Sequence, residues 1–238
     1  MVNPRAWLAE AIATFGLVFF GPLSVILGVV VFGDGALSTE AIIMISLGHG
    51  GAIALMVYAF GHVSGAHINP AVTIPMMITK KIGVKDGIGY ILFQIIGAVV
   101  ATASLAVLFP ELGKQVLWGA HGGPSELLNN SLMSGLVVEI ILTFFLVTVI
   151  FMTAVHKKAP KSVYGAAIGG MVFLLHLVGV PLTGASMNPA RSFSPALVSG
   201  DAGLWEVQWL YWVGPIVGGI IAGLIMNYLY VNKAEKEA

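Results

Sequence analysis

Two stretches of this 238-residue chain are near copies of each other, SGAHINPA at residues 64–71 and TGASMNPA at residues 183–190. Asn is a good N-cap residue, and Pro is favoured at the first helical position because its missing N–H would be unpaired there and its φ is already helical. Asn69 and Asn188 are therefore expected to start two helices. A single Asn-Pro pair is often only a turn signal, but two copies in the same context indicate a repeated structural element.

The chain around these motifs is too apolar for a soluble protein. Apolar residues make up 58% of it and charged residues only 9%, whereas an ordinary soluble domain has about 25% charged residues. A membrane-spanning helix needs about 20 apolar residues. Six stretches of this kind lie at about 6–31, 41–60, 88–109, 133–154, 163–180 and 207–230. The segment after each Asn-Pro motif is apolar for only roughly ten residues, so it is expected to enter the bilayer without crossing it.

These segments divide the chain into two similar halves, at about 1–115 and 130–232. Each half has three spans, an odd number, so the second half must enter the membrane from the opposite face. We therefore expect one membrane domain, residues 1–238, with an all-α fold of six transmembrane helices and two re-entrant half-helices in an inverted repeat. In such repeats the broken helices meet near the bilayer midplane, where the functional site lies.

The meeting of two helix starts has chemical consequences. Each helix N-terminus carries about half a positive elementary charge, and Asn69 and Asn188 each add an amide donor. A neutral molecule can have its oxygen held there, whereas a cation meets two positive fields. Irregular backbone at membrane depth is tolerated only where it lines a wet cavity. The carbonyls of the loops before the caps are thus the expected pore acceptors, namely those of Gly65, Ala66, His67, Gly184, Ala185 and Ser186.

Charge in the connections predicts the orientation. All but one of the Lys and Arg residues outside the motifs fall on the side that carries both termini, and only Lys114 falls on the other. The positive-inside rule then places both termini in the cytoplasm. Because 11 basic residues balance 11 acidic ones, no basic surface indicates a nucleic-acid partner. The absence of cysteine from the sequence excludes disulfides and thiolate metal sites.

Over nearly its whole length the sequence resembles the aquaporin, or major intrinsic protein, family, in its water-selective, prokaryotic-looking form. The resemblance is carried by GHVSGAHINPAVT at 61–73, TGASMNPARSF at 183–193 and YWVGP at 211–215. It implies a passive water channel in the cell membrane, with one pore per subunit, a homotetrameric assembly and no metal or organic cofactor. It also implies that Glu10 and Glu139, at equivalent places in the two halves, hydrogen-bond the looped backbone before each half-helix. Intramembrane carboxylates can instead serve as proton relays, so a proton-coupled transporter is the competing interpretation.

The resemblance also implies a selectivity filter, located by spacing from the two caps. His49 lies twenty residues before Asn69, His176 lies twelve before Asn188, and Arg191 follows Asn188 by three. Ala185 fills the remaining filter position. His176 and Ser192 match water-selective members, since glycerol-conducting members usually have Asp where Ser192 lies. His49 departs from the Phe of most water channels and resembles plant vacuolar members linked to ammonia.

Three other functions remain open as alternatives. The first is a facilitator of ammonia, glycerol or another small neutral solute, which His49 favours. The second is a closed structural membrane protein, and the third, the least favoured, is an intramembrane hydrolase that uses Ser64 with His67 or His176. Of the remaining histidines, His62 is expected near the inner mouth of the pore. The last two, at positions 121 and 156, lie in connections and are expected to face solvent.

Overall fold

The computed structural model of the protein describes residues 3–231, and over these residues it contains helices and loops only. The long helices are α1 (Pro4–Val25), α2 (Thr39–Ser64), α4 (Val84–Leu108), α6 (Leu132–Ile150), α7 (Tyr164–Thr183) and α10 (Leu210–Met226). Turns of π-helix, η1 (Ile26–Val31), η4 (Phe151–Val155) and η5 (Asn227–Val231), prolong α1, α6 and α10. Within the described residues, six helical segments are long and apolar enough to cross a bilayer. Each predicted span overlaps one of them, so the six-span prediction is confirmed.

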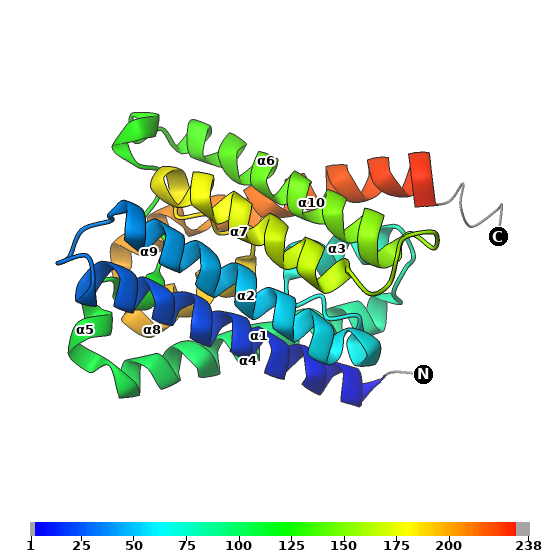
Figure 1. The fold of residues 1–238 in the computed structure, drawn as a ribbon, viewed down its shortest axis with the longest axis horizontal. Coiled ribbons are helices and arrows are strands. Elements are labelled where there is room, and N and C mark those ends of the chain that lie inside the picture. The colour runs from blue at the N-terminus through cyan, green and yellow to red at the C-terminus, as the bar shows by residue number, and fades with distance from the viewer. Residues whose placement is uncertain (1–2, 232–238) are drawn as a thin grey trace.

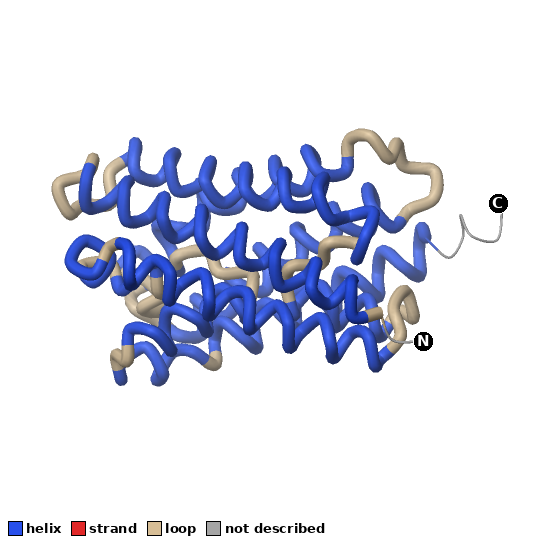
Figure 2. Tube along the Cα trace, turned by 90° about the horizontal axis from the view of Figure 1, so that it is seen from below, coloured by secondary structure: helices blue, strands red, loops and turns tan. Residues whose placement is uncertain are grey.

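The two half-helices are α3 (Pro70–Ile78) and α8 (Pro189–Ser199). Each has its Asn as N-cap in an extended conformation and Pro at its start, as the sequence predicts. Figure 1 shows α3 near the end of the bundle where the described chain begins and finishes, and α8 near the opposite end. In Figure 2, loop segments lie inside the helical bundle as well as at its two ends.

The packing of the helices shows the inverted repeat. Helix α1 packs on α2 and α4, and in the same way α6 packs on α7 and α10. The halves are joined through α2 and α7, and each half-helix also packs on the last long helix of the other half, α3 on α10 and α8 on α4. Close approach depends on small residues: a Cβ on Gly97 would lie 2.1 Å from the carbonyl oxygen of Ala11, and one on Gly218 would lie 2.2 Å from that of Ile140.

Short elements cover the end of the bundle near α8. They are α5 (Pro110–Lys114), the 3₁₀ turns η2 (Leu117–Gly119) and η3 (Glu126–Leu128), and α9 (Ala202–Gln208). Leu117 and Trp118 both have positive φ, 46° and 50°, and Gly119 follows at 81°. Three successive residues in this conformation turn the chain sharply. This turn brings the connection between α4 and α6 back onto the half-helix α8, which η2 contacts.

Candidate functional site

The two half-helices are tied together through their cap residues. In both Asn69 and Asn188, the amide oxygen accepts from the backbone N–H two residues ahead, at 2.8 and 3.1 Å. The amide nitrogen of Asn69 donates across to the carbonyl of Met187 at 2.7 Å, and that of Asn188 donates to the carbonyl of Ile68 at 3.0 Å. A primary amide has a second N–H, and for both caps it has no partner among the described residues. Both residues line a cavity of about 850 Å³.

The loops before the two caps share one backbone pattern. Positive φ angles occur at Gly65 (86°), Ala66 (48°) and Ile68 (58°), and in the second loop at Gly184 (84°), Ala185 (54°) and Met187 (54°). Non-glycine residues in this region cost on the order of 1–3 kcal/mol each and persist only where the surroundings hold them. The inverted repeat therefore extends into the strained loops of the site.

Buried carboxylates hold these loops in place. Glu10 accepts from the Ser64 hydroxyl at 2.6 Å and from the backbone N–H groups of His67 at 2.9 Å and Ile68 at 2.7 Å. The side-chain amide of Gln94 adds a fourth bond at 2.8 Å. A backbone donor in the interior of a membrane-spanning bundle is costly to leave unpaired. Glu10 thus accepts hydrogen bonds from the N–H groups that have no acceptor within the first loop.

Glu139 makes the equivalent bonds in the second half. It accepts from the Thr183 hydroxyl at 2.7 Å and from the N–H groups of Ser186 and Met187, each at 2.9 Å. In each half a tyrosine also bonds to the loop before the cap. In the second half, the hydroxyl of Tyr211 donates to the carbonyl of Thr183 at 2.8 Å. In the first half, the hydroxyl of Tyr90 donates to the carbonyl of Ser64 at 2.7 Å. The sequence analysis missed Tyr90 and Gln94, although an alignment of the two repeats would have paired Tyr90 with Tyr211.

Arg191 and two histidines form a compact polar cluster. Arg191 is the third residue of α8, and its guanidinium donates to the carbonyl of Gly119 at 2.7 Å and lies 3.2 Å from Nε2 of His49. The rings of His49 and His176 are stacked, with 4.3 Å between centroids and 25° between planes. All three side chains are buried. The structure thus brings together three of the four residues that the resemblance assigns to the filter.

The two stacked imidazoles are held in the same orientation. Nδ1 of His49 is 2.9 Å from the carbonyl of Ile45, and Nδ1 of His176 is 2.8 Å from that of Val172, in each case four residues back along the helix. A carbonyl can only accept, so in a neutral ring Nδ1 carries the proton and Nε2 is the acceptor. Nε2 of His176 is buried and has no partner among residues 3–231.

The prediction that His121 faces solvent is wrong. His121 is 3% exposed, its Nε2 lies 2.7 Å from the Arg191 guanidinium, and its Nδ1 lies 3.0 Å from the Ser192 hydroxyl. Burial lowers the pKa of His121 well below its usual value, and the charge of Arg191 lowers it further. The tight turn at residues 117–119 places the His121 ring beside Arg191. No pattern in the sequence indicates that a histidine in a loop contacts a residue 70 positions later in the chain. His156, expected to face solvent too, is half-buried.

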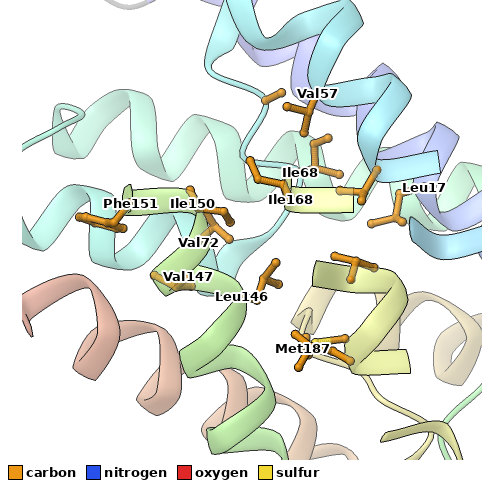
Figure 3. Close-up of a cluster of buried hydrophobic side chains, with 14 of the residues drawn as sticks. Leu17, Val57, Ile68, Val72, Leu146, Val147, Ile150, Phe151, Ile168 and Met187 are labelled. Carbon is orange, nitrogen blue, oxygen red and sulfur yellow. The ribbon is translucent and has the colours of Figure 1, made fainter. Parts of the chain in front are cut away.

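Arg191 lines two cavities. The larger, about 850 Å³, is lined by both caps, Arg191 and the His49–His176 pair. At the end of the bundle where the described chain begins and finishes, its lining includes His62, Lys81, Lys157 and Lys161. The smaller, about 170 Å³, is lined by His121, Gly119, Gly184 and Arg191. Apolar side chains form much of the remaining wall of the larger cavity. Six of the side chains that form it are shown in Figure 3, namely Leu17, Val57, Val72, Leu146, Ile150 and Ile168.

The predicted carbonyl-bearing residues fall mostly along these cavities. Gly65, Ala66, His67 and Ser186 line the larger cavity, and Gly184 lines the smaller. Ala185 is fully buried and is not among the residues that line either cavity. Its place in the filter therefore stays a prediction.

The contacts of Ser64 bear on the hydrolase alternative. Its hydroxyl donates to Glu10 at 2.6 Å and accepts from the N–H of Ala66 at 3.0 Å. Nδ1 of His67 is paired with the Thr73 hydroxyl at 3.1 Å. A nucleophilic serine needs a base within hydrogen-bond reach, and in the described part of the chain Ser64 has no bond to a histidine ring.

Comparison with known proteins gives consistent matches. The sequence profile of the family described as "Major intrinsic protein" matches residues 1–226. The chain is 42% identical to human Aquaporin-4 over 196 residues, which is 81% of this chain and 58% of the length of that relative. It is 38% identical to Aquaporin TIP2-3 of Arabidopsis thaliana over 97% of this chain and 89% of that one. A solved aquaglyceroporin from Plasmodium falciparum shares the fold, with a TM-score of 0.84 over 98% of this chain and 99% of that one at 22% identity.

Proposed function

The chain belongs to the major intrinsic protein family of membrane channels, and on that premise we propose that it passes water passively, in single file. The observation that carries this proposal concerns the cap residues Asn69 and Asn188. The side-chain amide of each donates to the loop that precedes the other, and both residues line one cavity. In each amide, one N–H donates to a backbone carbonyl in the other half of the inverted repeat, and the second N–H can donate to a solute. A water molecule that passes the caps can thus exchange its bonds with other waters for bonds to two fixed donors.

The same arrangement would oppose cations. The two half-helix N-termini, each worth about half a positive charge, carry the caps Asn69 and Asn188, and Arg191 lines both cavities. No acidic side chain is among the residues that line either cavity. Glu10 and Glu139 are engaged with the backbone of the loops instead. This placement supports a channel over a proton-coupled transporter.

Selectivity for water over glycerol is proposed from the crowding around Arg191. The stacked pair of His49 and His176 lies on one side of the guanidinium, and His121 lies within hydrogen-bond distance of it. The three carbons of glycerol would have to pass the guanidinium and the imidazole rings. These polar groups can bond to water, but they offer the carbon backbone of glycerol no apolar surface, and the rings narrow the path. The filter is therefore proposed to consist of His49, His176, Ala185 and Arg191, with His121 as a further member.

Stopped-flow light scattering on proteoliposomes tests the proposal. The protein should give fast osmotic shrinkage with a low activation energy, and glycerol should equilibrate no faster than in liposomes without protein. Circular dichroism and gel filtration of the same preparation establish that the protein is folded. Water permeability equal to that of empty liposomes, with folded protein, would contradict the proposed function and favour a closed structural role.

Ammonia is the second candidate solute, and a specific observation favours it. Nε2 of His176 is a buried acceptor without a partner in the described residues, whereas the same nitrogen of its stacked neighbour His49 is 3.2 Å from the Arg191 guanidinium. Ammonia has three N–H donors and could bond to the free acceptor of His176 while its lone pair faces Arg191. A pH-sensitive dye inside the proteoliposomes would record ammonia entry directly, separately from water flow.

The remaining assignments are proposed on the same basis. The domain is residues 1–238, with inverted repeats at about 1–115 and 130–232, and the protein is proposed to act as a homotetramer in the cell membrane. Both described chain ends lie at one end of the bundle (Figure 1), where the cavity mouth is lined by Lys81, Lys157 and Lys161. The positive-inside rule supports a cytoplasmic location for this end. Protease accessibility of tagged termini in sealed vesicles tests it.

A further inference from the structure

Gly21 lies in α1 where the helix meets the ring of His49. A Cβ built on Gly21 would lie 2.6 Å from both Cδ2 and Nε2 of His49 and 3.1 Å from Cε1. Carbon atoms do not approach so closely, so even one methyl group at position 21 requires the ring to move. His49 therefore lies as close to α1 as it does only because residue 21 has no side chain.

The other contacts of His49 leave the ring little freedom. Nδ1 is bonded to the carbonyl of Ile45 at 2.9 Å, and Nε2 lies 3.2 Å from the Arg191 guanidinium. The ring is also stacked on His176. A side chain at position 21 would push the imidazole away from α1 and disturb its contacts with His176 and Arg191. His176 and Arg191 both line the larger cavity.

We infer that Gly21 is a positioning residue that sets how far the His49 ring stands back from the pore, and so sets the bore of the constriction. The inference rests on the proposed function, in which His49 lines the path of the solute. Gly21 itself touches no solute and acts only through His49. With glycine at position 21, the His49 ring can lie close to α1 and the filter is open. Alanine at this position would displace the ring and narrow the filter.

Two other glycines serve as matched controls for an added methyl group. Gly16 lies on the same helix and is also buried, but its Cβ would meet Sδ of Met56, at 2.6 Å. Because that side chain is unbranched and flexible, it can give way. Gly51 lies on α2, two residues after His49, and a Cβ there would have no neighbouring atom within 4 Å.

The test compares Gly21→Ala, Gly16→Ala and Gly51→Ala with the parent, and repeats Gly21→Ala in a His49→Ala background. Two quantities are measured, water permeability in proteoliposomes and the ¹⁵N resonances of the His49 ring in histidine-labelled protein. We expect Gly21→Ala to shift the His49 resonances and to lower permeability on the order of tenfold, as overpacking by one methyl group does when it strains the conducting state. The controls should stay within about twofold of the parent. In the His49→Ala background, Gly21→Ala should have no effect.

Unchanged His49 resonances in Gly21→Ala would overturn the inference, and so would an equal loss of permeability in the His49→Ala background. If Gly21→Ala does not fold, folding of the double variant supports the inference, because removal of the ring relieves the clash, and failure of both contradicts it. A parent without water permeability would contradict the proposed function alone, since the resonances still decide whether Gly21 positions His49.

Discussion

The side-chain amide of Asn69 donates to the carbonyl of Met187, 2.7 Å away and 118 residues later in the chain. Met187 directly precedes the second cap, Asn188. The side-chain amide of Asn188 in turn donates to the carbonyl of Ile68 in the first loop. Each half of the protein thus fixes the loop of the other half. Because the two bonds are reciprocal, a change at one cap should affect both half-helices.

Replacement of Asn69 by Asp tests the role of the cap. Aspartate still caps α3, but it loses the Nδ2 donor to Met187 and places a negative charge in the cavity. A unit charge about 4 Å from a cation is worth about 4 kcal/mol at an effective dielectric constant near 20. We expect a sodium leak measurable with a fluorescent indicator, together with lower water permeability. Asn130→Asp, in an exposed loop, is the matched control, and a leak of the same size in both variants would contradict this role.

Replacement of Glu139 by Gln should destabilise the second loop. Gln keeps one acceptor but directs an NH₂ group at a backbone donor, either Ser186 or Met187. Leaving such a group unpaired costs about 1–3 kcal/mol. Thermal unfolding in detergent should show a lowered midpoint, whereas Glu126→Gln, at an exposed position, should melt like the parent. An unchanged midpoint in Glu139→Gln would show that the loop does not depend on the carboxylate.

Replacement of Arg191 by Val should remove the positive charge that borders both cavities and release Gly119 and His49 from their donor. We expect faster glycerol equilibration and a proton leak, both measured in proteoliposomes with the parent at equal incorporation. If the proton leak does not change, the helix dipoles at Asn69 and Asn188 set the barrier alone.

Replacement of His49 by Phe separates the two candidate solutes. Phe retains a ring that can stack on His176 but has no nitrogen to accept from ammonia or from Arg191. We expect ammonia entry, followed with an internal pH dye, to fall by about tenfold, while water permeability changes by less. A solute profile identical to that of the parent would remove the reason to assign His49 a role in selectivity.

His121 should make stability depend on pH. Its pKa is held well below the usual value by burial and by Arg191, so the unfolded chain binds a proton more readily than the folded protein. Its contribution is present in full above about pH 6.5 and is lost progressively as the pH drops below that value. His121→Gln cannot titrate and can still accept from Arg191, so its unfolding midpoint should fall less between about pH 7.5 and 5.5. Equal slopes for variant and parent would contradict a buried, neutral His121.

Much of the fold could be predicted because it depends on local sequence and on the bilayer. The six spans follow from the length of their apolar stretches, and the half-helices follow from the capping chemistry of Asn69-Pro70 and Asn188-Pro189. The odd number of spans per half fixes the inverted repeat. None of these features depends on which helix packs against which.

The sequence by itself thus determined the class of protein, the inverted repeat and the two helix starts, because apolar length, parity and N-cap preference act within a few residues or through the surrounding lipid. Only the tertiary structure decided which groups surround the constriction. It placed His121 against Arg191, the ring of His49 against Gly21, and the amide of Asn69 on the carbonyl of Met187. Such contacts join distant segments, and they form only when turns and helix crossings have set the positions of whole elements, which no local pattern encodes.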